Sequence, residues 1–298
     1  MNFFYLPKKE VNFKCLLRAL LSTFQKREHM HIAIAGNIGS GKTSLTKLLS
    51  KHYRWQAHYE EILENPYLDD FYHEMERWSF NLQIYFLNSR FGQLMEIQKS
   101  GKKVIQDRTI YEDAFIFAPN LHAMGLLTKR DFENYKQLFD LMENMVTGPD
   151  LMIYLRSSIP NLVDNIHRRG RDYENSISID YLSRLNERYE AWVHGYDKGK
   201  LLIIDVDEMN FVDKPEALGK IIEMIDELSK IILKLNLCRK ELREYDKQFK
   251  SSEPLSSSAK ISRKNSVAFD TAQSLQQKLY QQQKSVTSSL IGLQTQKE

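Results

Sequence analysis

The sequence predicts an α/β fold in which helices cover both faces of a parallel sheet. From Met30 to about Ser229, short runs rich in β-forming residues alternate with amphipathic segments, which is the pattern of βαβ units. A glycine-rich loop follows the first run and precedes a segment with helical periodicity. Ligands of open α/β sheets gather at the carboxyl ends of the strands, so this loop also indicates where a site should lie.

Apolar runs predict strands at residues 31–35, 56–60, 103–107, 151–155 and 201–205. Charged residues stand at or next to the ends of the last four runs: Glu60, Asp107, Arg156 and Asp205. Because the carboxyl ends of parallel strands meet at one edge of a sheet, we expect chemistry at these positions.

The glycine-rich loop is typical of a phosphate-binding loop. Its glycines let the backbone turn so that N–H groups point at an anion, and the following helix adds the positive end of its dipole. Lys42 is expected to reach the outer phosphates and Thr43 to ligate Mg²⁺. The alternative is a glycine turn that only joins a strand to a helix, but the flanking pattern favours nucleoside triphosphate binding. The expected phosphate-binding residues are Gly36, Asn37, Ile38, Gly39, Ser40, Gly41, Lys42 and Thr43.

Composition excludes several classes of protein. The chain has 298 residues, and its 42 basic residues nearly balance 39 acidic ones, which argues against a nucleic-acid scaffold. No stretch approaches the roughly 18 apolar residues that span a membrane. Cys15 and Cys238 lie far apart, so we expect neither a disulfide framework nor a zinc site. A soluble protein of the reducing cytoplasm is expected.

The chain is expected to divide into three parts. Residues 1–29 form a disordered extension, with a transit peptide or a docked helix as alternatives, and residues 30–229 form the globular domain. Residues 230–298 hold a helical extension and a Ser- and Gln-rich tail that is expected to be disordered. Apolar residues in alternating steps of three and four, from Ile221 to Phe249, predict a heptad seam on one long helix. That helix either pairs with another chain or folds back on its own domain.

Glu60 and Glu61 place two carboxylates at the end of the second predicted strand. A general base must lie within hydrogen-bond reach of the hydroxyl that it deprotonates, and a strand end beside a phosphate-binding loop satisfies this condition. A solvated acidic turn before Asn65 is the alternative.

A predicted helix that begins near Glu76 carries Gln83 and Arg90 seven residues apart, on the same face. A Gln amide and an Arg guanidinium on one stripe can bind a planar heterocycle by hydrogen bonds. An exposed polar stripe is the alternative, but the many aromatic residues of this segment make a mostly exposed helix less consistent with the sequence.

Two further motifs carry charges suited to phosphate chemistry. Asp107 can hold Mg²⁺ through water, and Arg108 can neutralise phosphate or keep a carboxylate ionised; a structural ion pair between them is the alternative. The segment 167–174 groups arginines around Gly170, which suits a lid that clamps phosphates. A nucleic-acid patch is the competing interpretation of that segment, without a wider basic field to support it.

With these motifs in order, residues 30–229 resemble the deoxynucleoside kinase family, most closely its bacterial deoxyadenosine/deoxyguanosine kinase branch. The resemblance rests on five motifs: residues 36–43, Glu60 with residues 65–68, residues 80–83 with Arg90, residues 107–109, and residues 169–171 with Glu174. It implies a P-loop kinase fold with a five-stranded parallel sheet, an arginine-bearing lid and a homodimer formed through the long helices.

The resemblance also implies roles for individual residues. Glu60 would take the proton from the nucleoside 5′-hydroxyl, and Arg108 would hold Glu60. ATP with Mg²⁺ would be the phosphate donor, with Thr43 and Asp107 at the metal, and the lid arginines would be Arg169 and Arg171. The 3′-hydroxyl would bind Tyr72 and Glu174, and the base would contact Gln83, Arg90 and Asp113 and stack on Phe117. The adenine of the donor would be lined by the segment 207–211, which includes Asp207, Glu208 and Phe211.

The expected function is therefore ATP-dependent phosphorylation of deoxyribonucleosides, purines in particular, in nucleotide salvage. Glu61 stands where many relatives have Pro, so the base is Glu60 or Glu61, and the alignment favours Glu60. Asn165 stands where many relatives have a lid arginine, so the clamp has one cation fewer or Arg168 replaces it. The alternatives are a thymidylate-kinase-like monophosphate kinase and a regulatory nucleotide-binding protein that works through its tail.

Overall fold

The computed structural model describes residues 29–60, 65–171, 174 and 177–251. The chain separates into two compact units, Met1–Ser229 and Lys230–Glu298. The first unit contains the sheet and the phosphate-binding loop. Most of residues 1–29 and the tail after Ser251, for which the sequence predicts disorder, lie outside the described residues.

The predicted five-stranded parallel sheet is confirmed, with the strand order β2-β3-β1-β4-β5. Its strands are β1 (Met30–Gly36), β2 (Gln56–His58), β3 (Lys103–Asp107), β4 (Leu151–Arg156) and β5 (Lys200–Asp205). The edge strand β2 ends two residues before Glu60, earlier than predicted, because only three of its residues pair with β3. Glu60 therefore lies in the connection after the strand.

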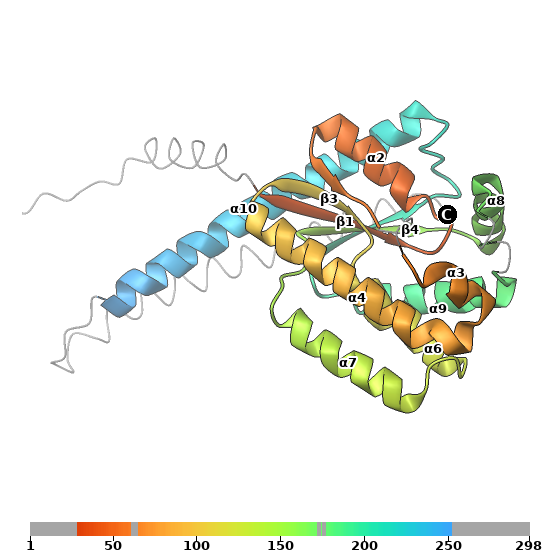
Figure 1. The fold of residues 1–298 in the computed structure, drawn as a ribbon. Helices are drawn as coiled ribbons and strands as arrows, with labels where there is room; N and C mark the ends of the chain where they lie inside the picture. Colours follow the sequence, from red (N-terminus) through yellow and green to blue (C-terminus); the bar gives the residue numbers. More distant parts are fainter. Residues whose placement is uncertain (1–28, 61–64, 172–173, 175–176, 252–298) are drawn as a thin grey trace, which may run out of the picture. The chain divides into compact units, whose positions relative to one another are not determined.

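Helices cover both faces of the sheet, as predicted. In Figure 1, α2 lies above the sheet, whereas α4, α7 and α9 lie below it, and α4 contacts α7. Besides the first residues of α10 (Pro215–Ser251), the described helices of the first unit are α2 (Lys42–Tyr53), α3 (Leu68–His73), α4 (Met75–Ser100), α5 (Ile110–Glu112), the π-helical turn η1 (Asp113–Phe117), α6 (Ala118–Ala123), α7 (Lys129–Glu143), α8 (Ile159–Arg169) and α9 (Ile179–His194).

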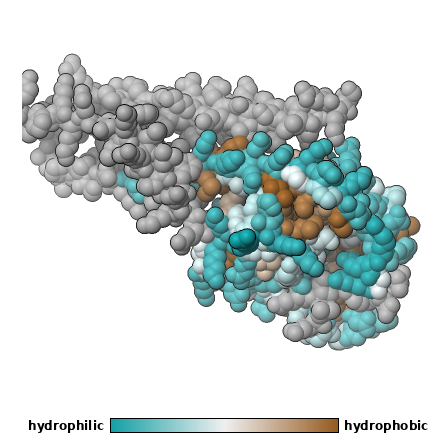
Figure 2. Space-filling model, turned by 90° about the horizontal axis from the view of Figure 1, so that it is seen from above, coloured by the Kyte–Doolittle hydropathy of each residue, from teal (hydrophilic) through white to brown (hydrophobic). Residues whose placement is uncertain are grey.

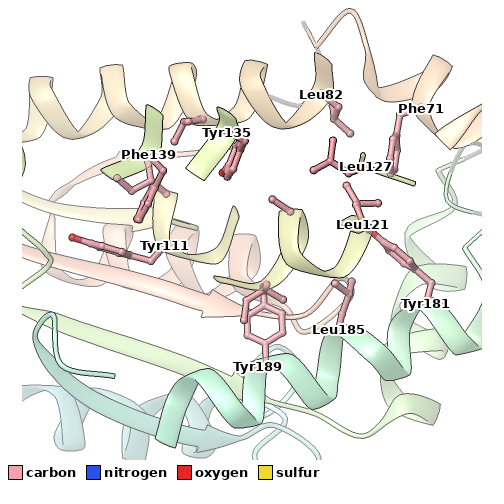
Figure 3. Packing of buried hydrophobic residues seen from close by; sticks show 14 of the residues in the cluster. Phe71, Leu82, Tyr111, Leu121, Leu127, Tyr135, Phe139, Tyr181, Leu185 and Tyr189 are labelled. Carbon is pink, nitrogen blue, oxygen red and sulfur yellow. The ribbon is translucent and has the colours of Figure 1, made fainter. Parts of the chain in front are cut away.

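The core lies on both sides of the central strand. β1 runs between β3 and β4, and all of its residues are buried, which explains its continuous apolar character. On the lower face, aromatic and leucine side chains of α4, α7 and α9 meet those of η1 and α6. In Figure 3, Tyr181, Leu185 and Tyr189 point from α9 into this layer, and Leu82 points toward it from α4. This packing fixes the helices that carry the polar residues of the site.

The last described helix, α10 (Pro215–Ser251), confirms that the segment with heptad spacing is helical. Within the first unit, Ile221, Ile225 and Leu228 are its buried apolar residues, whereas Met224 is only half-buried. The buried face thus uses Ile225 where the predicted seam uses Met224. The pairing of this helix with another chain stays a prediction.

The surface of the described residues is mainly hydrophilic in the view of Figure 2, with hydrophobic residues over a limited area. In the part of the chain that the structure describes, no helix combines the length and the apolar character needed to cross a membrane.

His31, in the buried strand β1, should make stability depend on pH. Its ring Nε2 lies 2.9 Å from Gln106 Oε1, and burial lowers its pKa from 6.5 to about 4. The ring is therefore neutral in the folded protein, whereas the unfolded chain takes up a proton as pH falls below 6.5. The free energy of unfolding should therefore decrease as pH falls from 6.5 toward 4, by about 2 kcal/mol for every 1.5 pH units.

Denaturant unfolding at pH 7 and pH 5 measures this effect, with His31→Gln as the comparison. The variant cannot titrate at this position, so its free energy of unfolding should change less between the two pH values. An equal change in both proteins would exclude His31 as the cause.

Candidate active site

The predicted phosphate-binding loop joins β1 to α2 and requires glycine at two points. Gly39 and Gly41 have φ angles of 86° and 91°, a region that residues with a Cβ avoid. A Cβ on Gly39 would lie 2.6 Å from the carbonyl oxygen of Leu162, and one on Gly41 would lie 3.2 Å from the Phe211 ring. The loop can therefore take this shape and pack this closely only with glycine.

Two asparagines tie the loop to the helices beside it. Asn37 Nδ2 donates to the carbonyl oxygen of Leu182 at 3.0 Å and to Asn186 Oδ1 at 3.1 Å, both on α9. Asn165 Nδ2, on α8, donates to the carbonyl oxygen of Gly39 at 2.8 Å. The residue that stands in place of a lid arginine is thus a tether of the loop.

Lys42 lies buried under the loop, and its Nζ donates to the carbonyl oxygen of Asn37 at 2.8 Å. Burial, with the nearby Arg108 guanidinium, lowers the pKa of Lys42 to about 7 despite the neighbouring carboxylates. A bound anion would favour the charged form, so the site is built to become fully cationic at Lys42 when phosphate is present.

Thr43 and Asp107 lie together at the start of α2 and the end of β3. Thr43 Oγ1 donates to Asp107 Oδ2 at 2.5 Å, while Asp107 Oδ1 is buried without a hydrogen-bond partner among the described residues. Burial raises the pKa of Asp107 against the opposing effect of Lys42. A hydroxyl beside a buried carboxylate oxygen that lacks a donor fits an oxygen-ligated cation such as Mg²⁺.

Glu60 stands between two guanidinium groups. Arg108 Nε lies 3.3 Å from Glu60 Oε1, and Arg90 Nη2 donates to the same oxygen. Burial alone would raise the pKa of Glu60, but Arg108, Arg90 and other cations overcome this and lower it. Glu60 is therefore an ionised carboxylate at neutral pH. Glu61, the alternative base, lies outside the described residues.

Arg90 of α4 connects Glu60 to Asp113, since its Nη1 donates to Asp113 Oδ2 at 2.5 Å. Burial raises the pKa of Asp113 to about 7, although Arg90 and Arg108 act against the shift. Gln83, on the same face of α4 as Arg90, is buried, and its Oε1 has no partner among the described residues. The predicted polar stripe of α4 is therefore buried and offers hydrogen bonds.

Arg108 has a positive φ of 69°, which is unusual for a residue other than glycine. This conformation follows directly after β3, where the Arg108 N–H donates to the carbonyl oxygen of Ile34 at 2.9 Å. Its guanidinium lies over the Phe117 ring, 4.8 Å from the ring centre. Asp107 and Arg108 thus have different partners rather than each other.

Two further residues of the site, Glu112 and Tyr189, were not predicted from the sequence. Glu112 is fully buried and accepts hydrogen bonds from Arg108 Nη1 at 3.2 Å and from the Tyr189 hydroxyl at 2.8 Å. The spacing of three between Thr109 and Glu112, which is typical of a capping box, was a signal for the position of Glu112. Tyr189 is too far away in sequence to be found by spacing.

Of the predicted lid, residues 167–171 and 174 are described. Arg169 Nη2 donates to Glu174 Oε2 at 2.6 Å, and Arg171 Nη1 donates to Glu174 Oε1 at 3.3 Å. Glu174, predicted to bind a sugar hydroxyl, thus also holds both predicted lid arginines. Arg168 donates to Asn165 instead.

The loop after β5 is fixed to the start of α8 by Asp207. Its carboxylate accepts from Ser157 Oγ at 3.0 Å, from the Ser158 N–H at 3.0 Å and from Asn161 Nδ2 at 2.9 Å. Phe211, from the same loop, is buried against the phosphate-binding loop. Asp207 therefore positions the loop that was predicted to line a nucleotide base.

Two pockets meet at the phosphate-binding loop. The first has a volume of about 710 Å³ including the solvent at its mouth, and the second about 1330 Å³. Both are lined by Lys42, Thr43, Arg169 and Arg171. The first also contains these predicted residues: Ile38, Glu60, Tyr72, Gln83, Arg90, Arg108, Asp113, Phe117 and Glu174. The second also contains Gly39, Ser40, Gly41, Asn165, Arg168, Asp207 and Phe211.

Several predicted residues lie outside both pockets. Gly36, Asn37, Asp107 and Glu208 line neither, and Glu208 is exposed. Arg156, at the end of β4, pairs with Glu190 of α9 at 2.7 Å, and Asp205 accepts from the Asp207 N–H at 3.1 Å. The last two strand ends therefore have structural partners, not a place in the pockets.

Comparison with known proteins gives consistent matches. A sequence profile described as "Deoxynucleoside kinase" matches residues 32–230. A deoxyadenosine/deoxycytidine kinase of Bacillus subtilis is 38% identical over 65% of this chain and 90% of its own length. A deoxyadenosine kinase of Dictyostelium discoideum is 38% identical over 70% of this chain and 84% of its own length. The structure of deoxyadenosine kinase from M. mycoides with dCMP and dCDP bound matches with a TM-score of 0.60 and 28% identity, over 66% of this chain and 100% of that one.

Proposed function

The chain belongs to the deoxynucleoside kinase family, and we propose that it transfers a phosphoryl group from ATP to the 5′-hydroxyl of a purine deoxyribonucleoside, with Glu60 as the general base. The protein is a phosphotransferase whose product is the nucleoside 5′-monophosphate. The first pocket would hold the nucleoside, and the second would hold ATP. We call them the acceptor pocket and the donor pocket.

The observation that carries this proposal is that the two pockets meet at a group of cations. Lys42, Arg169 and Arg171 line both pockets, and Glu60 lines only the acceptor pocket. Phosphoryl transfer asks the protein mainly to place donor and acceptor in line and to neutralise the charge of the transferred group. The three cations lie where the pockets meet, and the carboxylate of Glu60 lies on the acceptor side. This supports in-line transfer from a donor in one pocket to an acceptor in the other.

Glu60 would accept the proton of the 5′-hydroxyl as the bond to phosphorus forms. Its lowered pKa keeps it ionised at neutral pH, at the cost of basicity. Arg108 and Arg90 hold the carboxylate on one oxygen, which leaves Glu60 Oε2 for the hydroxyl. Lys42 would stabilise the charge on the transferred phosphoryl group.

Mg²⁺ fits the site at Thr43 and Asp107, where it would neutralise the phosphate charge when bound. The buried Oδ1 of Asp107, which has no partner among the described residues, supports this assignment. Loss of turnover on chelation, with recovery on adding Mg²⁺, would test it, whereas turnover that withstands complete chelation would contradict it.

Base recognition would use polar groups that line the acceptor pocket. Gln83 Oε1 offers a buried acceptor that an exocyclic amino group can satisfy, and Arg90 with Asp113 offers a further donor and acceptor. Phe117 supplies an aromatic face for the base. This set supports adenine, guanine or cytosine over thymine.

Phosphate transfer from ATP to a panel of nucleosides tests the proposed function. Turnover should be highest with deoxyadenosine or deoxyguanosine, lower with deoxycytidine and lowest with thymidine. Deoxythymidylate serves as the control for a monophosphate kinase. Transfer to deoxythymidylate alone would contradict the proposal.

We further propose that residues 30–229 form the kinase domain and that the chain is a homodimer. A chain that ends at Ser229 should keep turnover within about threefold of the full chain, because every residue assigned to the site precedes that point. Loss of most turnover would assign the C-terminal part a role in catalysis. Light scattering of the full chain measures the oligomeric state, and a monomeric mass would contradict the homodimer.

A further inference from the structure

Glu112 lies buried between the phosphate-binding loop and Arg108, and the mechanism above does not use it. Its side chain is fully buried. A buried carboxylate is costly unless donors replace its lost hydration. Glu112 has four such donors, so its position is strongly determined.

The two oxygens of Glu112 have different partners. Oε2 accepts from the Thr109 N–H at 2.9 Å, which closes the first turn of α5 as a helix cap. Oε1 accepts from the Gly36 N–H at 3.2 Å, Arg108 Nη1 at 3.2 Å and the Tyr189 hydroxyl at 2.8 Å. A cap needs only the first oxygen, and the second joins three separate elements.

We propose that Glu112 is a positioning residue that fixes Arg108 relative to both Glu60 and the phosphate-binding loop. This inference rests on the proposed role of Glu60 as the base. The Arg108 guanidinium is a rigid plane, so fixing Nη1 on Glu112 also fixes the direction of Nε. Nε is the atom that lies 3.3 Å from Glu60.

Tyr189 completes the arrangement from α9. Arg108 Nη1 donates to the Tyr189 hydroxyl at 2.9 Å, and that hydroxyl donates to Glu112. Because the Gly36 N–H binds the same carboxylate oxygen, the first residue of the loop and the partner of the base share one anchor. A displacement of about 1 Å between reacting groups can reduce the rate by about 100-fold. Holding these two groups at a fixed separation therefore supports catalysis.

The charge of Glu112 also acts on Glu60. The cations that face Glu60 are Arg108, Arg90, Lys42 and Arg171, and Glu112 offsets the first of them. The carboxylates of Asp107 and Asp113 also interact with Glu60, in the opposite sense to the cations. Without that negative charge, Arg108 would stabilise ionised Glu60 more strongly. The pKa of Glu60 would fall further, and the carboxylate would be a weaker base.

Steady-state kinetics of Glu112→Gln in the full chain test the inference. We expect kcat to fall by about 10- to 100-fold with a nucleoside KM within about threefold of the original. The acidic limb of the pH profile of kcat, where Glu60 becomes protonated, should move to lower pH. Glu112→Asp, which keeps the charge but is shorter, should lose kcat and leave the acidic limb in place.

Tyr189→Phe provides a second variant that leaves the cap of α5 intact. It should lower kcat several-fold without moving the acidic limb, since no charge is removed. The chain offers a matched pair of controls: Glu190 accepts from the Tyr154 hydroxyl at 3.0 Å and from Arg156, and it lines neither pocket. Glu190→Gln and Tyr154→Phe should keep kcat and the pH profile.

Two results would overturn the inference. In the first, Glu112→Gln lowers thermal stability but leaves both kcat per folded molecule and the acidic limb of the pH profile unchanged. That result would mean that Glu112 serves only as the helix cap of α5. In the second, Tyr189→Phe is as active as the control variant Tyr154→Phe. This result would overturn the inference even if Glu112→Gln does not fold. A failure of the proposed function can be distinguished from a failure of this inference. If Glu60 were not the base, Glu60→Gln would retain both turnover and the acidic limb of the pH profile.

Discussion

Replacing Glu60 by Gln should remove most turnover, by about 100- to 10,000-fold in kcat, while nucleoside affinity stays within a few-fold. The amide keeps the shape of the carboxylate and can still accept a hydrogen bond from Arg90. It cannot take the proton of the 5′-hydroxyl, and general-base catalysis has an effect of this size. The measurements are kcat with saturating ATP and the nucleoside Kd by calorimetry.

The control for this prediction is Glu61→Gln, which changes the other carboxylate of the pair. It should keep turnover within a few-fold, because Glu60 is the carboxylate that contacts Arg108 and Arg90. The opposite result, with Glu60→Gln active and Glu61→Gln inactive, would move the base to Glu61. Near-normal turnover in both variants would reject a carboxylate base from this segment.

The centre of the fold was predictable because the inner strands β1, β3 and β4 are short and mostly buried. β1 lies between two neighbours, so its apolar run is unbroken, and the prediction for 31–35 differs from Met30–Gly36 by one residue at each end. The edge strand β2 was predicted too long. Its last residues continue the apolar-polar pattern, but β3 offers no further pairing after His58.

The grouping of site residues was predictable where a motif fixes the backbone. Gly39, Gly41 and Lys42 belong to one motif, in which Lys42 is the first residue of the helix after the loop, and Gln83 and Arg90 share a helix face by spacing alone. The structure places Lys42, Gln83 and Arg90 around one pocket. Their catalytic and binding roles stay predictions.

Contacts between distant segments were not predictable from spacing. Glu112 contacts Gly36 and Tyr189, which lie 76 and 77 residues away along the chain. Glu208 belongs to a loop, where no periodicity indicates which side chains face inward, and the structure leaves it exposed. Arg156 looked suitable for chemistry by its place at a strand end, but Glu190 is its partner.

Replacing Lys42 by Met should have opposite effects on activity and stability. Removal of a cation that we propose stabilises the transferred phosphoryl group should reduce kcat by about 100- to 1,000-fold. The same change should raise the free energy of unfolding by a few kcal/mol at pH 7, because the folded protein no longer has to bury an ammonium group. Met keeps the length and the apolar part of the side chain.

The pH dependence identifies the cause of the added stability. The pKa of Lys42 is lowered from 10.5 to about 7 in the folded protein, so between these values the unfolded chain binds more protons. Stability of the original protein should therefore rise with pH from 7 toward 10.5, and the advantage of Lys42→Met should shrink over that range. Denaturant unfolding of both proteins at pH 7 and pH 9.5 measures it. A variant that is less stable at pH 7 would show that the hydrogen bond from Lys42 to Asn37 outweighs the cost of burial.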